Sequence, residues 1–143
     1  MADSAKLMKE ACLGCKYAIE SIEIAKGYSV GSKMGVILGE YEREHRKIRD
    51  ELSAKIKERG QKEYRHPGIG AAMTKLQTNL SLTVNPSYGN IAELMINGCN
   101  TGIKNLSKKK NKAKGADEES TAALNRVIDC EMRMINDMLP FLK

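Results

Sequence analysis

The chain has 143 residues, a length that fits one domain built around one hydrophobic core. Hydrophobic residues make up 41% of it but aromatic residues only 4%, with no Trp, which argues against an all-β sandwich or barrel and favours helices. The net charge of +6 comes from 24 basic and 18 acidic residues that are mixed along the chain, so charge alone is weak evidence for an anionic partner. We therefore expect a single all-α domain over residues 1–143.

Two long helices are predicted in the first sixty residues. Apolar residues recur there at three- and four-residue intervals and predict a helix over about 4–26, with Asp3 or Ser4 available as its N-cap. A second apolar stripe, with charged residues on the opposite side, predicts the longest helix over about 32–59. Gly60 then ends it.

The connection that follows, from Gly60 to Pro86, is too long for a plain loop in a compact domain. Apolar residues keep a helical period through its middle, and this predicts a short crossing helix over about 69–84. Such a helix would cover about 24 Å, close to the length of a helical bundle.

Two further long helices complete the chain. One is predicted over about 87–113 and begins at Ser87, after an Asn-Pro pair that disfavours helix. The other is predicted over about 117–142, with Asp117 as its N-cap. With a long connection in the middle, the four long helices are expected to form two helical hairpins joined by a crossover.

Two polar residues interrupt stripes that are otherwise apolar. His45 lies on the second stripe, three residues after Glu42, and a Glu-x-x-His spacing projects a carboxylate and an imidazole from one region of a helix. These groups bind divalent iron, manganese or zinc. Glu131 lies on the stripe of the last helix, at a similar height in the bundle, and a buried carboxylate needs a partner. The alternative is a core histidine whose hydrogen bonds are satisfied by Glu42, Tyr41 or a facing carboxylate.

This combination of architecture and motif resembles the ferritin-like superfamily, which includes bacterioferritins and rubrerythrins. Its metal-binding members take a Glu from each of two helices and Glu-x-x-His from each of the other two. Glu42 and His45 match one such motif, but Met132 and Met134 stand where a second His is required after Asp129 and Glu131. The resemblance implies a ferritin-like four-helix bundle with a short fifth helix in the crossover. The resemblance assigns Glu42 and His45 to one motif and either Glu20 or Glu23 to the single Glu of the first helix, and Glu131 is added as a metal ligand because of its position on the last stripe.

Four cysteines are possible thiol ligands: Cys12, Cys15, Cys99 and Cys130. A zinc site usually has two closely spaced pairs, whereas only one Cys-x-x-Cys pair is present here. The alternative interpretation is that they are small buried residues that fill the bundle core. The first residues carry no apolar signal core, which favours a cytoplasmic, reducing location.

Glycines and lysines form two further patterns. Close helix packing, or room for a ligand, is expected at five glycines: Gly31, Gly35, Gly39, Gly98 and Gly102. The lysines within 108–114 complement the C-terminal end of a helix dipole. They also suggest a phosphate or nucleic-acid patch, although nucleic acid is unlikely as a partner because no aromatic residue is interleaved with them.

These observations favour a binding or structural module over an enzyme, because no phosphate loop, dinucleotide fingerprint or nucleophile–base pair is present. One alternative is an iron, manganese or zinc protein that works in redox chemistry or metal storage. A second alternative is anion or nucleic-acid binding through the lysines at 108–114. A homodimer through an apolar helix face is possible, and no membrane partner is expected, because no apolar run approaches about 20 residues.

Overall fold

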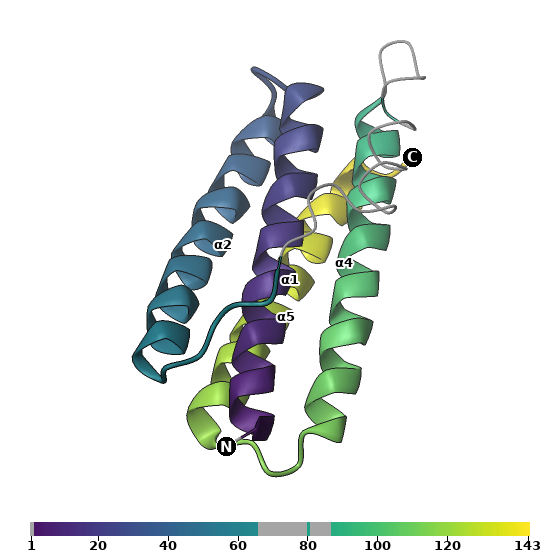
Figure 1. Cartoon of the computed structure of the whole chain (residues 1–143). Helices are drawn as coiled ribbons and strands as arrows, with labels where there is room; N and C mark the ends of the chain where they lie inside the picture. The colour runs from purple at the N-terminus through teal and green to yellow at the C-terminus, as the bar shows by residue number, and fades with distance from the viewer. Residues whose placement is uncertain (1, 66–79, 81–86) are drawn as a thin grey trace.

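The structure is a computed structural model that describes residues 2–65, 80 and 87–143. Its long helices are α1 (Ala2–Gly27), α2 (Lys33–Glu58), α4 (Tyr88–Lys112) and α5 (Glu118–Met138), followed by a short 3-10 helix, η1 (Leu139–Phe141) (Figure 1). No strand occurs in these residues, so the all-α prediction is confirmed. The predicted crossing helix over 69–84 lies, except for Leu80, outside the described residues.

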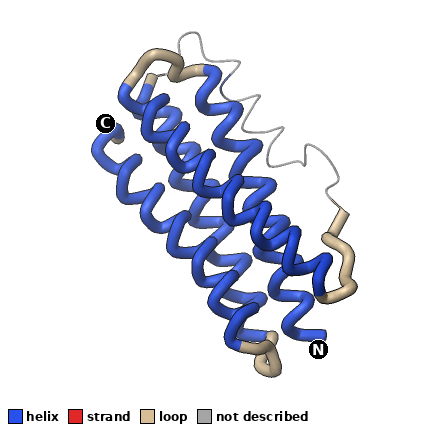
Figure 2. The backbone as a smooth tube through the Cα atoms, turned by 90° about the vertical axis from the view of Figure 1, so that its left-hand side faces the viewer, coloured by secondary structure: helices blue, strands red, loops and turns tan. Residues whose placement is uncertain are grey.

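The four long helices lie side by side along a common direction (Figures 1 and 2). α1 and α5 begin at the same end, where the Ser4 hydroxyl accepts a hydrogen bond of 2.8 Å from the Asp117 backbone N–H. α2 also ends there, because Arg59 pairs with the Asp117 carboxylate at 2.9 Å. α4 begins at the opposite end, where Gly89 lies against the carbonyl oxygen of Phe141 in η1. The helices therefore form two antiparallel hairpins, as predicted.

The core lies between the hairpins. α1 packs against α2, α4 and α5, and α2 and α4 flank the other two helices on opposite sides (Figure 1). Burying one large aliphatic side chain contributes about 1.5–3 kcal/mol to the free energy of unfolding, so most of the stability of the bundle comes from this apolar core. The largest fully buried side chains are Leu7, Met8, Ile22, Met34, Leu38, Ile48, Ile56, Leu80, Ile91, Leu124, Met134 and Met138.

Capping explains most of the helix boundaries. Ser87 and Asp117 are N-caps, as predicted, and their side chains accept hydrogen bonds from the backbone N–H groups of Asn90 and Ser120. Gly60, with φ of +69°, follows the end of α2. Among the described helices, none has an apolar segment long enough to cross a membrane.

Two boundary predictions are wrong. Asp3 and Ser4 do not cap the first helix, because α1 already includes them. Instead the Asp3 carboxylate accepts a hydrogen bond of 2.9 Å from the Gly115 N–H, so these side chains hold the α4–α5 turn. The last helix does not continue to 142. It ends at Met138 because Pro140 has no N–H to continue the α-helical hydrogen bonds, and η1 follows.

Of the five glycines expected to allow close packing, Gly35 has the close contact, whereas a Cβ at Gly39 would make ordinary contacts and one at Gly31 would meet nothing within 4 Å. A Cβ at Gly35 would lie closer than 3.0 Å to the carbonyl oxygen of Ser29, so the α1–α2 turn requires glycine there. Gly31 lies in the same turn with φ of +75°, a conformation that favours glycine. At Gly98 and Gly102 a Cβ would meet nothing within 4 Å, so close packing does not explain these two.

We expect Gly35→Ala to lower the free energy of unfolding by about 1–3 kcal/mol, because the new methyl group collides with a backbone oxygen. Gly98→Ala is the matched control. It makes the same chemical change inside a helix without a collision, and should raise the free energy of unfolding by about 0.5–1 kcal/mol. Urea titrations followed by circular dichroism measure both, and equal effects of the two substitutions would contradict the close approach at Gly35.

Candidate functional site

In the part of the chain that the structure describes, the interior of the bundle holds one imidazole, that of His45 on α2, which has no exposed surface. Its Nδ1 lies 2.7 Å from the carbonyl oxygen of Tyr41, one turn earlier in the helix. A carbonyl only accepts, so Nδ1 carries a proton and donates it. Nε2 lies 3.2 Å from Oε1 of Glu131 on α5. Both ring nitrogens are therefore engaged, and the contact predicted between the two stripes is present.

Glu131 is 6% exposed and is the only carboxylate classed as buried in the described part of the chain. Burial by itself lowers the pKa of His45, but the hydrogen bonds and charges of Cys130 and Glu131 outweigh it and raise the pKa to about 10. At neutral pH the two side chains consequently form an imidazolium–carboxylate pair. Such a pair is stable inside a protein only when each charge has the other as its partner.

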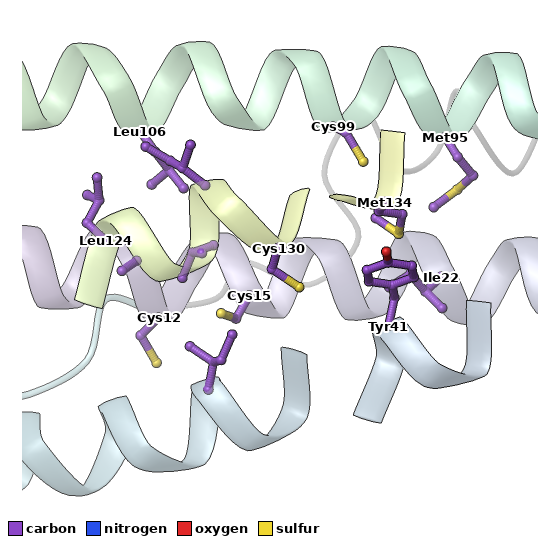
Figure 3. Close-up of a cluster of buried hydrophobic side chains, with 14 of the residues drawn as sticks. Cys12, Cys15, Ile22, Tyr41, Met95, Cys99, Leu106, Leu124, Cys130 and Met134 are labelled. Carbon is purple, nitrogen blue, oxygen red and sulfur yellow. The ribbon is translucent and has the colours of Figure 1, made fainter. Parts of the chain in front are cut away.

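Three buried cysteines from three helices lie in the core: Cys15 of α1, Cys99 of α4 and Cys130 of α5 (Figure 3). All three interact with the pair, because the charge of Glu131 acts on Cys15 and Cys99 and Cys130 approaches His45. The Cys130 Sγ is 3.8 Å from the His45 Nδ1. Burial raises the pKa of the Cys15 and Cys99 thiols, and the charge of Glu131 adds to the effect. These two side chains are accordingly neutral thiols, and all four cysteines of the sequence are free.

Cys130, His45 and Glu131 stand in the order of a nucleophile, a base and an orienting acid, but the geometry does not suit that chemistry. The Nδ1 proton of His45 is donated to the Tyr41 carbonyl, so this nitrogen is not an acceptor for the Cys130 thiol proton. An imidazole with a pKa of about 10 is also already protonated at neutral pH. The arrangement is therefore better suited to holding α2 against α5 than to proton transfer.

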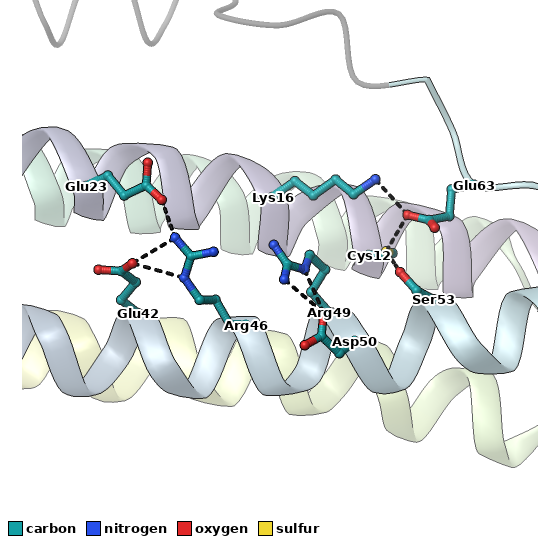
Figure 4. A network of polar contacts seen from close by, with 9 residues as sticks. All are labelled: Cys12, Lys16, Glu23, Glu42, Arg46, Arg49, Asp50, Ser53 and Glu63. Carbon is teal, nitrogen blue, oxygen red and sulfur yellow. Dashed lines mark hydrogen bonds and ion pairs between the residues drawn. The ribbon is translucent and has the colours of Figure 1, made fainter.

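Glu23 and Glu42 of the predicted metal set have other partners than His45. Glu42 accepts hydrogen bonds from the Lys26 Nζ at 2.9 Å and the Arg46 Nε at 3.0 Å. Figure 4 shows Arg46 between Glu42 and Glu23, with which it also pairs. Burial raises the pKa of Glu42, but the hydrogen bonds from Lys26 and Arg46 outweigh it and hold the pKa below its ordinary value. Glu20 is partly buried on α1. Glu42 thus faces α1, and the structure does not bring it to His45.

Cys12 is also separate from the core pair. Its thiol donates to the Glu63 carboxylate at 3.3 Å, and that carboxylate pairs with Lys16 at 2.6 Å (Figure 4). Burial raises the pKa of Cys12 to about 11. Within the described residues, no three His, Cys, Asp or Glu side chains converge in a way that could hold a metal ion. The donors present therefore do not fit the two-metal carboxylate centre that the ferritin-like resemblance implies.

The second region of interest is the end of the bundle where α1 begins and α4 ends. Lys108, Lys109, Lys110 and Lys112 lie in the last turns of α4, and Lys114 follows its end. The Lys109 Nζ is 3.5 Å from the Glu10 carboxylate of α1. Lys110 donates to the Asn125 side chain of α5 at 3.0 Å. The lysine-rich end of α4 is thereby placed against the first turns of α1.

An open cavity of about 350 Å³ lies at this same end, between α1 and the segment that follows α2. Its lining residues are Ala2, Ala5, Lys6, Lys9, Gln61 and Tyr64. No pattern in the sequence predicted this cavity. The spacing of Lys6 and Lys9 puts both on one side of a helix, but no local pattern indicates that residues 61–65 return across α1.

Compared with known proteins, the chain matches no family model, no curated protein and no solved structure.

Because the pKa of His45 is higher in the folded chain than the 6.5 of a free side chain, the folded state holds a proton that the unfolded state releases. The contribution of the pair to stability is complete below pH 6.5 and is lost as the pH rises toward 10. We expect the free energy of unfolding of metal-free protein to fall by up to about 1.4 kcal/mol per pH unit between pH 6.5 and 8.5.

Glu131→Gln should remove most of this slope, because it takes away the charge that holds the proton on His45. Glu51→Gln is the control, since it removes a carboxylate from the exposed surface of α2, where Glu51 pairs with Arg126. Urea titrations at several pH values measure the slopes. Equal slopes for the wild type and Glu131→Gln would show that the pair is not the source.

Proposed function

We propose that this chain is a ferritin-like helical bundle that serves as a binding module for anionic partners. Two antiparallel hairpins, with α1 and α5 parallel to each other, support the ferritin-like assignment. The binding surface in this proposal is the basic end, which comprises Lys6 and Lys9 of α1 together with Lys108, Lys109, Lys112 and Lys114.

The observation that carries the proposal is the position of Lys109. It contacts Glu10 of α1, and its charge also acts on Tyr64, lowering a pKa that burial and Glu10 raise. The lysine-rich end of α4 and the cavity lysines of α1 therefore belong to one surface rather than to two. The C-terminus of a helix carries only about half a negative charge. The dipole of α4 is therefore too small to neutralise the lysines at its end.

A surface of this kind binds anions through charge, and its affinity depends on salt because bound counterions are released. No aromatic residue interrupts lysines 108–114, so this lysine segment lacks the stacking platforms of sequence-tolerant nucleic-acid binders. The proposal is accordingly for an anionic ligand held by charge, without base-specific recognition.

We expect inorganic polyphosphate to bind, with an affinity that falls steeply as salt increases. Replacing Lys108, Lys112 and Lys114 by Gln should make the slope of log affinity against log salt shallower by about 1 for each lysine that contacts the ligand. The matched control replaces the exposed residues Lys33, Lys47 and Lys143. Fluorescence titration with labelled polyphosphate measures the slopes, and an equal effect of both triple variants would contradict a localised surface.

A metal-binding redox or storage protein is the second candidate, and one feature favours it. The His45 Nδ1 donates to a backbone carbonyl and so orients Nε2 toward Glu131, and metal-ligating histidines are fixed in the same way. Against it stand the dispersed carboxylates and the cationic surroundings of Glu42. We therefore regard the His45–Glu131 pair as structural.

On this view, protein purified anaerobically without added metal should contain less than about 0.1 equivalent of iron, manganese or zinc, far below the one equivalent of a filled site. Elemental analysis by mass spectrometry measures this. Stoichiometric metal that is lost in His45→Ala but kept in Glu42→Gln, with both variants folded by circular dichroism, would instead establish a core metal site. A homodimer and a cytoplasmic location remain predictions.

A further inference from the structure

The cavity at the basic end has two walls from different parts of the chain. One wall is the first turns of α1, with two alanines and two lysines, and the other is the segment after α2, with Gln61 and Tyr64. Its volume of about 350 Å³ is near the lower limit for cavities that bind small molecules. It is large enough for one small ligand.

Specific contacts hold both walls in place. Glu63, between the two lining residues of the second wall, pairs with Lys16 at 2.6 Å and accepts the Cys12 thiol hydrogen bond at 3.3 Å (Figure 4). The Lys9 Nζ lies 5.5 Å from the centroid of the Tyr64 ring, a cation–π contact that joins the walls directly. A ligand therefore meets a wall that is already ordered, which lowers the entropic cost of binding.

Within the described residues, the two lysines that line the cavity have no carboxylate within ion-pair distance, unlike several other lysines of the chain. Lys16, Lys26, Lys55 and Lys109 each have a carboxylate within ion-pair distance. In the described part of the chain, neither Lys6 nor Lys9 has one, although both line the cavity. Two ammonium groups three residues apart on a helix repel each other, and a dianion between them would relieve that repulsion.

The other lining groups indicate what the rest of the ligand is like. The Gln61 amide and the Tyr64 hydroxyl donate and accept hydrogen bonds without charge, and the alanines give a small apolar wall. From these groups we infer that the cavity binds a small phosphomonoester, with the phosphate between Lys6 and Lys9 and an uncharged organic part against Gln61, Tyr64 and the alanines. This inference rests on the proposed anion-binding function and gives it a ligand class and a position.

Calorimetric titration of the full chain with AMP, inorganic phosphate and adenosine, at constant low ionic strength, tests it. We expect one AMP to bind per chain, phosphate to bind more weakly, and adenosine not to bind. Lys6→Gln with Lys9→Gln should weaken AMP binding at least tenfold, whereas Lys6→Arg with Lys9→Arg should retain it. The control pair, Lys33→Gln with Lys143→Gln, makes the same charge change at the other end of the bundle and should have an effect below threefold.

The double variant Lys108→Gln with Lys112→Gln separates this inference from the proposed function. If it abolishes AMP binding while Lys6→Gln with Lys9→Gln does not, anions bind on α4 and the cavity assignment is wrong. If neither AMP nor inorganic phosphate saturates, or if adenosine binds as tightly as AMP, the cavity is not a phosphomonoester site. A lack of binding by polyphosphate as well would overturn the proposed function itself. Thermal melts followed by circular dichroism establish that each variant is folded.

Discussion

The ion pair between His45 and Glu131 is the constraint on which the arrangement of the two hairpins depends. It joins α2 of the first hairpin to α5 of the second, and both side chains are removed from water. Breaking a buried pair by removing one partner costs about 3–5 kcal/mol, whereas replacing both by apolar groups is often neutral. Its physical role is therefore to specify one alignment: a shift of α2 along α5 would leave two charges buried without partners.

The contacts on either side of this pair follow the same alignment. Along α2, Tyr41 donates to Asp137 and Glu44 pairs with Arg133 before His45 is reached. Beyond it, Glu51 pairs with Arg126, and Arg59, just after the helix, pairs with Asp117 and Glu119. As the residue numbers rise along α2, those of the partners fall from Asp137 to Asp117, as expected for antiparallel helices. Each exposed pair contributes at most about 1 kcal/mol, so together they extend an alignment that the buried pair specifies.

The sequence predicted the features that depend on local periodicity, because a buried helix face repeats every three to four residues. The four long helices, the caps at Ser87 and Asp117, and the meeting of His45 with Glu131 all follow from it. The prediction that Glu42 lies beside His45 was wrong. Two side chains three residues apart on a helix point in directions that differ by about 60° around its axis. That rotation brings Glu42 to Lys26 and Arg46, and only the neighbouring α1 determines the outcome.

Features made by segments distant in sequence could not be predicted. Asp3 and Ser4 have the composition of a helix cap, yet they bind a turn more than a hundred residues away. The cavity depends likewise on residues 61–65 crossing α1, which the Lys16–Glu63 pair fixes.

The molecule contains two kinds of polar residue that differ in whether folding supplies a partner for their charge. The buried pair is satisfied within the protein and so serves the fold, whereas within the described residues Lys6 and Lys9 have no carboxylate partner and Lys9 lies over the uncharged ring of Tyr64. An excess of cations beside an ordered cavity is therefore better explained by a ligand from solution than by the stability of the bundle.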